Sequence, residues 1–83
     1  MQSQAMGQVR AQPSPADISS SIASARAQIA RYRFAPPRTG GERCYELKQI
    51  VRSLRAGRKG NAQAQWQQRM RHTCAAASKS TDL

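Results

Sequence analysis

Two cysteines, Cys44 and Cys74, carry the most distinctive chemistry of this 83-residue chain. Each lies 15 residues from the centre of a turn predicted near residue 59. Residues equidistant from the turn of an antiparallel helical hairpin lie opposite each other. Each cysteine also falls on the apolar face of its own predicted helix. The spacing therefore predicts a Cys44–Cys74 disulfide that closes the open end of a hairpin.

The alternative is a pair of reduced, buried thiols that act as small apolar residues. A disulfide that closes a loop of about 30 residues would contribute roughly 3–4 kcal/mol on the chain-entropy treatment. It would also indicate an oxidising compartment, foremost the periplasm or the extracellular space, with the mitochondrial intermembrane space or a virion as further candidates. Reduced cysteines would instead indicate the cytoplasm.

Neither cysteine is expected to serve catalysis or to bind a metal ion. The two cysteines and His72 supply at most three ligands, and they include no closely spaced cysteine pair. On an ideal helix His72 projects about 160° away from Cys74 around the axis. A Cys–His nucleophile would need the two side chains within hydrogen-bond reach. We therefore predict no enzymatic activity, no catalytic residue, no metal and no cofactor.

A first helix is predicted over residues 14–34, after a polar and flexible tail at residues 1–13. Ser14 can cap this helix, and Pro15 suits its first position. Two prolines then end the helix and open a Pro/Gly linker over residues 35–41. Apolar residues recur at spacings of three and four on one face of the helix. This helix 1 seam consists of Ile18, Ile22, Ile29 and Tyr32, with Ala25 between them.

A helical hairpin is predicted over residues 42–77. Gly57 is the expected stop of its first helix, and Asn61 is the expected cap of its second. The fold class is therefore all-α, a small three-helix protein in which helices 2 and 3 form a disulfide-tied antiparallel hairpin. Helix 1 either packs on the hairpin or extends to a neighbouring subunit. The expected ranges are 42–56 and 62–76 for the two helices and 78–83 for a flexible C-terminal tail.

The chain carries a formal net charge of +10, from 14 Lys and Arg against 4 Asp and Glu. Such an excess attracts nucleic acid, acidic protein surfaces or anionic lipid. On the predicted second helix and the turn after it, basic residues recur at spacings of three and four. We name this set the basic stripe: Lys48, Arg52, Arg55, Arg58 and Lys59. The stripe could receive an acidic protein or follow a phosphate backbone, and the plain alternative is a solvated helix face.

The expected function is that of a non-enzymatic interaction or assembly protein. A chain of this length buries a small core, worth about 3–5 kcal/mol, so an oligomer or a larger assembly is a reasonable setting. No segment approaches the roughly 18 apolar residues of a membrane span. We predict a basic, disulfide-tied hairpin that binds a larger acidic protein partner in an oxidising compartment.

The alternative is a nucleic-acid-binding protein that resembles a helix-turn-helix and has reduced cysteines. Its turn would contain glycine, as that motif prefers, and its last helix would present glutamines and arginines, which read base edges. The helices of that motif cross at about 90–120°. Such a crossing would carry Cys44 and Cys74 far apart, so an intact disulfide would exclude it. A basic peptide on a membrane surface is a third, weaker hypothesis.

Overall fold

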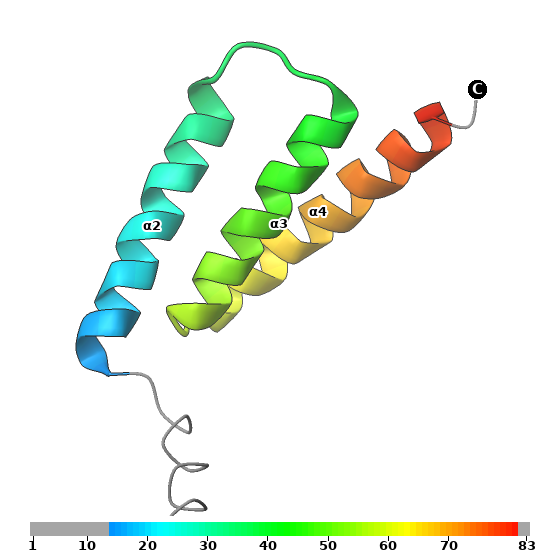
Figure 1. Cartoon of the computed structure of the whole chain (residues 1–83). Helices are drawn as coiled ribbons and strands as arrows, with labels where there is room; N and C mark the ends of the chain where they lie inside the picture. Colours follow the sequence, from blue (N-terminus) through cyan, green and yellow to red (C-terminus); the bar gives the residue numbers. More distant parts are fainter. Residues whose placement is uncertain (1–13, 82–83) are drawn as a thin grey trace, which may run out of the picture.

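The computed structural model describes residues 14–81, which form three α-helices and, within that range, no strand. Helix α2 spans Pro15–Phe34, α3 spans Gly40–Ala56 and α4 spans Gly60–Thr81. The chain reverses between successive helices, and α3 packs against both α2 and α4 (Figure 1). The predicted all-α fold of three helices is confirmed. The tail predicted for residues 1–13 lies outside the described residues.

Helix α2 begins and ends where the sequence predicts. The Ser14 side chain caps it by accepting a hydrogen bond of 3.2 Å from the backbone N–H of Asp17. Pro15 occupies the first position, where a missing N–H costs nothing. The helix ends at Phe34, and Ala35 is extended because the residue before a proline avoids the helical region.

Helix α3 begins at Gly40, two residues before the predicted start, so the linker is shorter than predicted. Thr39 is the N-cap of a complete capping box. Its hydroxyl accepts a hydrogen bond from the Glu42 backbone N–H at 3.1 Å, and the Glu42 carboxylate accepts one from the Thr39 N–H at 3.0 Å. The Thr-x-x-Glu pattern is a known sequence signature of a helix start. It places both linker glycines inside the first turn of α3.

Helix α3 stops at Gly57, as predicted, and the next residue turns the chain. Gly57 is the C-cap with φ −83°, whereas Arg58 adopts the left-handed conformation with φ 58°. The Lys59 N–H donates to the Leu54 carbonyl at 2.9 Å, and the Arg58 N–H donates to the Arg55 carbonyl at 3.0 Å. These two bonds form a Schellman motif, in which glycine usually takes the left-handed position. Here an arginine takes it.

Helix α4 is longer than predicted at both ends. It begins at Gly60, and the Lys59 carbonyl accepts from the Gln63 N–H at 2.8 Å, so Asn61 lies inside the helix and is not its cap. The helix continues to Thr81, so most of the C-terminal tail predicted for residues 78–83 is helical. The preceding alanines favour this extension because alanine has the highest helix propensity.

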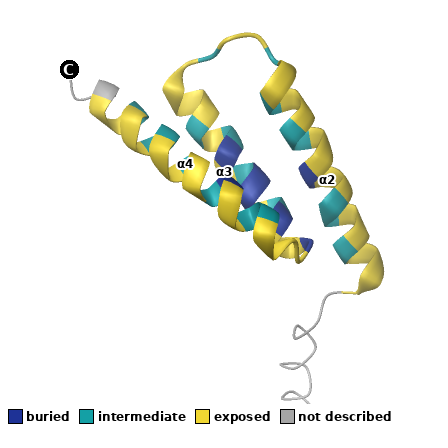
Figure 2. Ribbon diagram, turned by 180° about the vertical axis from the view of Figure 1, so that it is seen from behind, coloured by how far each residue is buried: buried dark blue, intermediate teal, exposed yellow. Residues whose placement is uncertain are grey.

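The core is built mainly on α3. Leu47 and Ile50 are fully buried there, and most of the ribbon coloured as buried belongs to α3 (Figure 2). Alanine from α2 and tryptophan from α4 complete the set. The buried residues are Ala25, Leu47, Ile50, Val51, Leu54 and Trp66, with Ile29, Tyr32, Ala62 and Met70 partly buried against them. Helix α3 is thus the element that holds the other two.

The helix 1 seam packs on the hairpin of its own chain, which is one of the two arrangements predicted for it. Ala25 is 1% exposed, and Ile29 and Tyr32 pack against the core. Ile22 lies over Gly57, and Ile18 is half-buried. The seam therefore fixes α2 to α3.

Candidate functional site

Cys44 on α3 and Cys74 on α4 are joined by a disulfide, as predicted from their spacing. Their Cα atoms are 4.8 Å apart, and 30 residues separate them in sequence. Helices α3 and α4 also lie close together beyond the bridge. A Cβ added at Gly40 would be 3.3 Å from the Ala77 Cβ. With both sulfurs engaged, neither cysteine can act as a thiolate nucleophile or as a metal ligand while the bridge is intact.

His72 is exposed on α4 and lines a shallow hollow of about 320 Å³. The hollow also contains Arg43, Thr73 and small residues, and its lining includes no carboxylate. A histidine that acts as a base is normally oriented by a third group. Within residues 14–81 no group of three or more His, Cys, Asp and Glu side chains could hold a metal ion.

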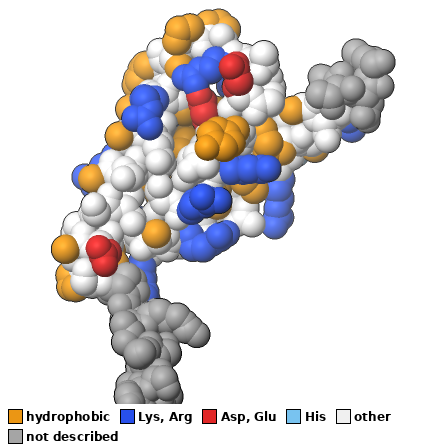
Figure 3. Space-filling model, viewed as in Figure 1, with side chains coloured by type: hydrophobic (Ala, Val, Ile, Leu, Met, Phe, Trp, Pro, Cys, Tyr) orange, Lys and Arg blue, Asp and Glu red, His pale blue; other side chains and the backbone are white. Residues whose placement is uncertain are grey.

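The basic stripe lies on the solvent side of α3 and in the turn that follows it. All five members are exposed: Lys48, Arg52, Arg55, Arg58 and Lys59. In the space-filling view, Lys and Arg side chains gather over the end of α3 that is nearer this turn and beside α4 (Figure 3). The stripe is thus a row of exposed cations along α3 and the turn that follows it.

The acidic side chains lie elsewhere. Asp17 is at the start of α2, and Glu42 and Glu46 are in the first half of α3. Glu42 is engaged in its capping box, and Glu46 forms an ion pair with Arg38 of the linker. Glu42 and Glu46 are therefore engaged with Thr39 and Arg38, near the start of α3.

A cluster of arginines and aromatic rings connects α2 to α4. The rings of Tyr32 and Trp66 meet edge to face, with centroids 5.9 Å apart and an interplanar angle of 85°. The guanidinium carbons of Arg33 and Arg69 lie 5.5 and 4.8 Å from the centroid of the Trp66 ring. Such contacts contribute about 0.5–1 kcal/mol each at exposed sites. We name Arg33, Trp66 and Arg69 the Trp66 cluster.

Arg43 of α3 extends this arrangement. Its guanidinium lies 5.1 Å from the Tyr32 ring centroid and donates a hydrogen bond of 3.2 Å to the Tyr32 hydroxyl oxygen. The alternation of arginine and aromatic residues at positions 31–34 predicts that this segment covers the hairpin. That holds for Tyr32, whereas Phe34 is 84% exposed. The sequence does not predict the contacts of this segment with Arg43, Trp66 and Arg69, because no local spacing connects those residues to α2.

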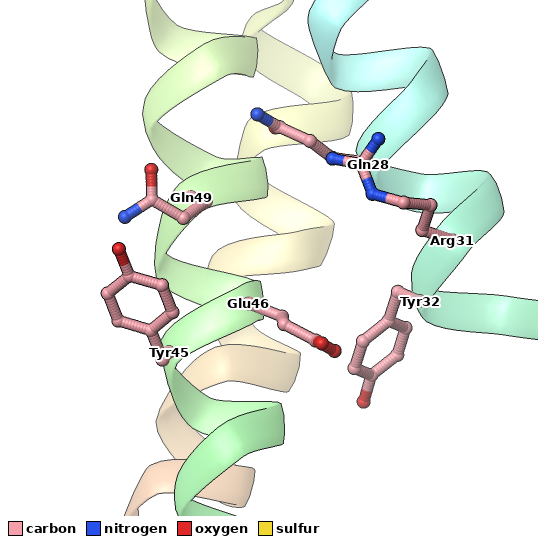
Figure 4. Close-up of a pocket in the computed structure, with 6 residues that line it drawn as sticks. All are labelled: Gln28, Arg31, Tyr32, Tyr45, Glu46 and Gln49. Carbon is pink, nitrogen blue, oxygen red and sulfur yellow. The ribbon is translucent and has the colours of Figure 1, made fainter. Parts of the chain in front are cut away.

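A second hollow, of about 390 Å³, lies between α2 and α3 (Figure 4). The Glu46 side chain points across it towards Tyr32, while Tyr45 and Gln49 stand on the α3 side. The Gln28 side-chain oxygen is buried without a hydrogen-bond partner. The lining mixes one carboxylate, one guanidinium, two phenols and two amides, so it offers polar contacts of both signs. This composition does not select an acidic ligand.

Comparison of the chain with protein-family models, with curated proteins and with solved structures found no match in any of the three. None of the helices within residues 14–81 is both long and apolar enough to cross a membrane. The features that bear on function are therefore the charge, the bridge and the Trp66 cluster.

Proposed function

We propose that this protein is a non-enzymatic interaction protein whose basic, disulfide-closed hairpin binds a larger acidic protein partner in an oxidising compartment. The observation that carries the proposal is the separation of charge. The basic stripe is exposed along α3, while Glu42 and Glu46 are occupied by a helix cap and an ion pair. An exposed surface of one sign accelerates the encounter with a partner of the opposite sign and fixes its orientation.

An acidic protein fits this surface better than duplex DNA does. The bridge keeps α3 and α4 side by side, whereas a helix-turn-helix needs its two helices to cross at about 90–120°. On α4, Gln63 donates a hydrogen bond of 3.3 Å to Gln67, so these two amides are partly occupied with each other. Nucleic-acid binding remains the second outcome that the experiment below separates.

The same bridge supports the proposed oxidising compartment. Disulfides of this kind persist in the periplasm, outside cells and in other oxidising spaces, and they are rare in the cytosol. The Cys44–Cys74 pair ties two helices that otherwise share a small core. A small domain often depends on such a cross-link for its stability.

The test compares two anionic probes on the oxidised full chain at physiological ionic strength. Fluorescence anisotropy follows binding of a labelled oligoglutamate peptide and of a labelled duplex DNA of arbitrary sequence. We expect saturable peptide binding that is tighter than DNA binding under the same conditions. DNA binding tighter than peptide binding would replace the proposal with the nucleic-acid alternative.

A matched pair of variants assigns the peptide affinity to the stripe. The double reversal Lys48→Glu/Arg52→Glu removes the same charge as Arg26→Glu/Lys79→Glu, whose exposed side chains lie on α2 and near the end of α4. The stripe variant should weaken peptide binding by about tenfold more than its control, because close charges contribute most. Equal losses in the two variants would show that net charge, and not the stripe, attracts the peptide.

A further inference from the structure

Two guanidinium groups converge on one buried ring. Trp66 is only 8% exposed, and both Arg33 from α2 and Arg69 from α4 are placed over it. Each arginine is itself exposed to solvent. Trp66 and its helix are held by the core and by the bridge farther along α4. The two cations are thus positioned by rigid elements.

Within residues 14–81 neither Arg33 nor Arg69 forms an ion pair, and each guanidinium lies over the Trp66 ring. Stacking on an aromatic ring uses the face of a guanidinium and leaves the N–H groups at its edge free to donate. Each guanidinium would therefore attract an anion placed beside the ring. The cluster is therefore a cationic site that lacks its counter-charge.

The same residues line an open hollow. It measures about 170 Å³ and is lined by Arg33, Gln65, Trp66 and Arg69. The Gln65 amide adds a neutral donor beside the two guanidiniums. A planar carboxylate matches the planar fork of arginine and can accept two parallel N–H bonds from it. The hollow thus has the donors and the size for a single acidic side chain.

We propose that the Trp66 hollow is the receptor for one Asp or Glu carboxylate of the acidic partner. This inference rests on the proposed function and adds to it the site that binds the partner directly. The stripe on α3 would then attract and orient the partner, while the hollow would bind one carboxylate directly. A compact site with two arginines and an amide suits an isolated carboxylate.

Trp66 is the one tryptophan of the chain, so its fluorescence reports directly on the hollow. The experiment titrates the oxidised full chain with an oligoglutamate peptide and records tryptophan emission. Arg33→Gln and Arg69→Gln should each weaken binding by about tenfold, the range for losing a hydrogen bond to a charged group. The control variants Arg52→Gln and Arg55→Gln, on the stripe, should each weaken binding by about twofold, as exposed charges do.

Lysine variants separate a receptor from a general charge effect. Arg33→Lys and Arg69→Lys keep the charge and an amphipathic side chain near the ring, but they lose the bidentate fork. We expect binding to remain about fivefold weaker than in the native protein, which is a partial recovery. Native affinity in both lysine variants would overturn the proposal. Far-UV circular dichroism and the melting temperature of each variant confirm that the helices are intact.

The remaining outcomes distinguish the two proposals. If the peptide does not bind the native protein at all, the proposed function fails and the receptor fails with it. If the peptide binds and the stripe reversal weakens it, while Arg33→Gln and Arg69→Gln weaken it no more than the twofold controls, only the receptor is wrong. If these two variants weaken duplex DNA binding and leave peptide binding unchanged, the hollow takes a phosphate and the carboxylate assignment is overturned.

Discussion

Ile22 of α2 lies directly over Gly57, so that a Cβ added to this glycine would be 2.8 Å from the Ile22 Cγ1 atom. The same Cβ would lie 3.3 Å from the Ile22 nitrogen and from the Ser53 carbonyl. Gly57 has φ −83°, which any residue adopts, so its small size and not its backbone freedom is what the fold requires. This contact is where α2 meets the end of α3.

Gly57→Ala should therefore destabilise the protein by about 1–3 kcal/mol, as overpacking does. Chemical denaturation followed by circular dichroism measures the change. Gly60→Ala is the matched control, because a Cβ there meets no atom within 4 Å, and it should be neutral or slightly stabilising. Combining Gly57→Ala with Ile22→Ala should cost less than the sum of the two single changes. If the two losses of stability are strictly additive, the contact between Ile22 and residue 57 is not the cause of the destabilisation by Gly57→Ala.

Arg58→Gly should stabilise the protein by about 1 kcal/mol, because glycine adopts the left-handed conformation without the Cβ penalty. Arg58→Ala is the control, since it removes the arginine side chain and keeps the strained φ of 58°. The difference between the glycine and alanine variants in urea denaturation isolates the backbone effect. A glycine variant no more stable than the alanine variant would contradict the Schellman geometry described for this turn.

Thr39→Ala should cost about 0.5–2 kcal/mol, since it removes the side chain that caps α3. Glu42→Ala should also destabilise the protein, while Glu42→Gln should cost less because glutamine can complete a capping box. Thermal melting of the three variants and of the double variant Thr39→Ala/Glu42→Ala tests the coupling of the two side chains. Losses that simply add would indicate that the two bonds act independently.

Removing the bridge with Cys44→Ala/Cys74→Ala should cost about 3–4 kcal/mol on the chain-entropy treatment for a loop of this length. That loss is comparable with everything that a small hydrophobic core contributes to the free energy of unfolding. The double variant should therefore be partly unfolded at 37 °C, as its far-UV circular dichroism would report. A double variant that melts at the same temperature as the oxidised native protein would show that the core alone maintains the fold.

The sequence predicts the features that follow from periodicity and symmetry. The seam of α2 and the pairing of Cys44 with Cys74 both emerge from spacing, because helical phase repeats locally and a hairpin is symmetric about its turn. Those features account for the confirmed fold class.

The helix ends were predicted less well, because caps depend on single side chains and on tertiary contacts. The Thr39–Glu42 capping box is visible as a sequence pattern, but the prediction placed both glycines in the linker instead. The role of Gly57 was not readable, since it depends on Ile22 from a different helix. The Trp66 cluster could not be predicted either, because it joins residues of α2 and α4 that are far apart in sequence.

The Cys44–Cys74 bridge holds the basic hairpin closed, and the state of the two sulfurs in native material tests this most directly. Protein isolated from its natural source is alkylated before and after reduction, and its intact mass is measured. We predict no added alkyl group before reduction and two after it. Two alkyl groups before reduction would contradict the account, because the cysteines would then be free and the compartment reducing.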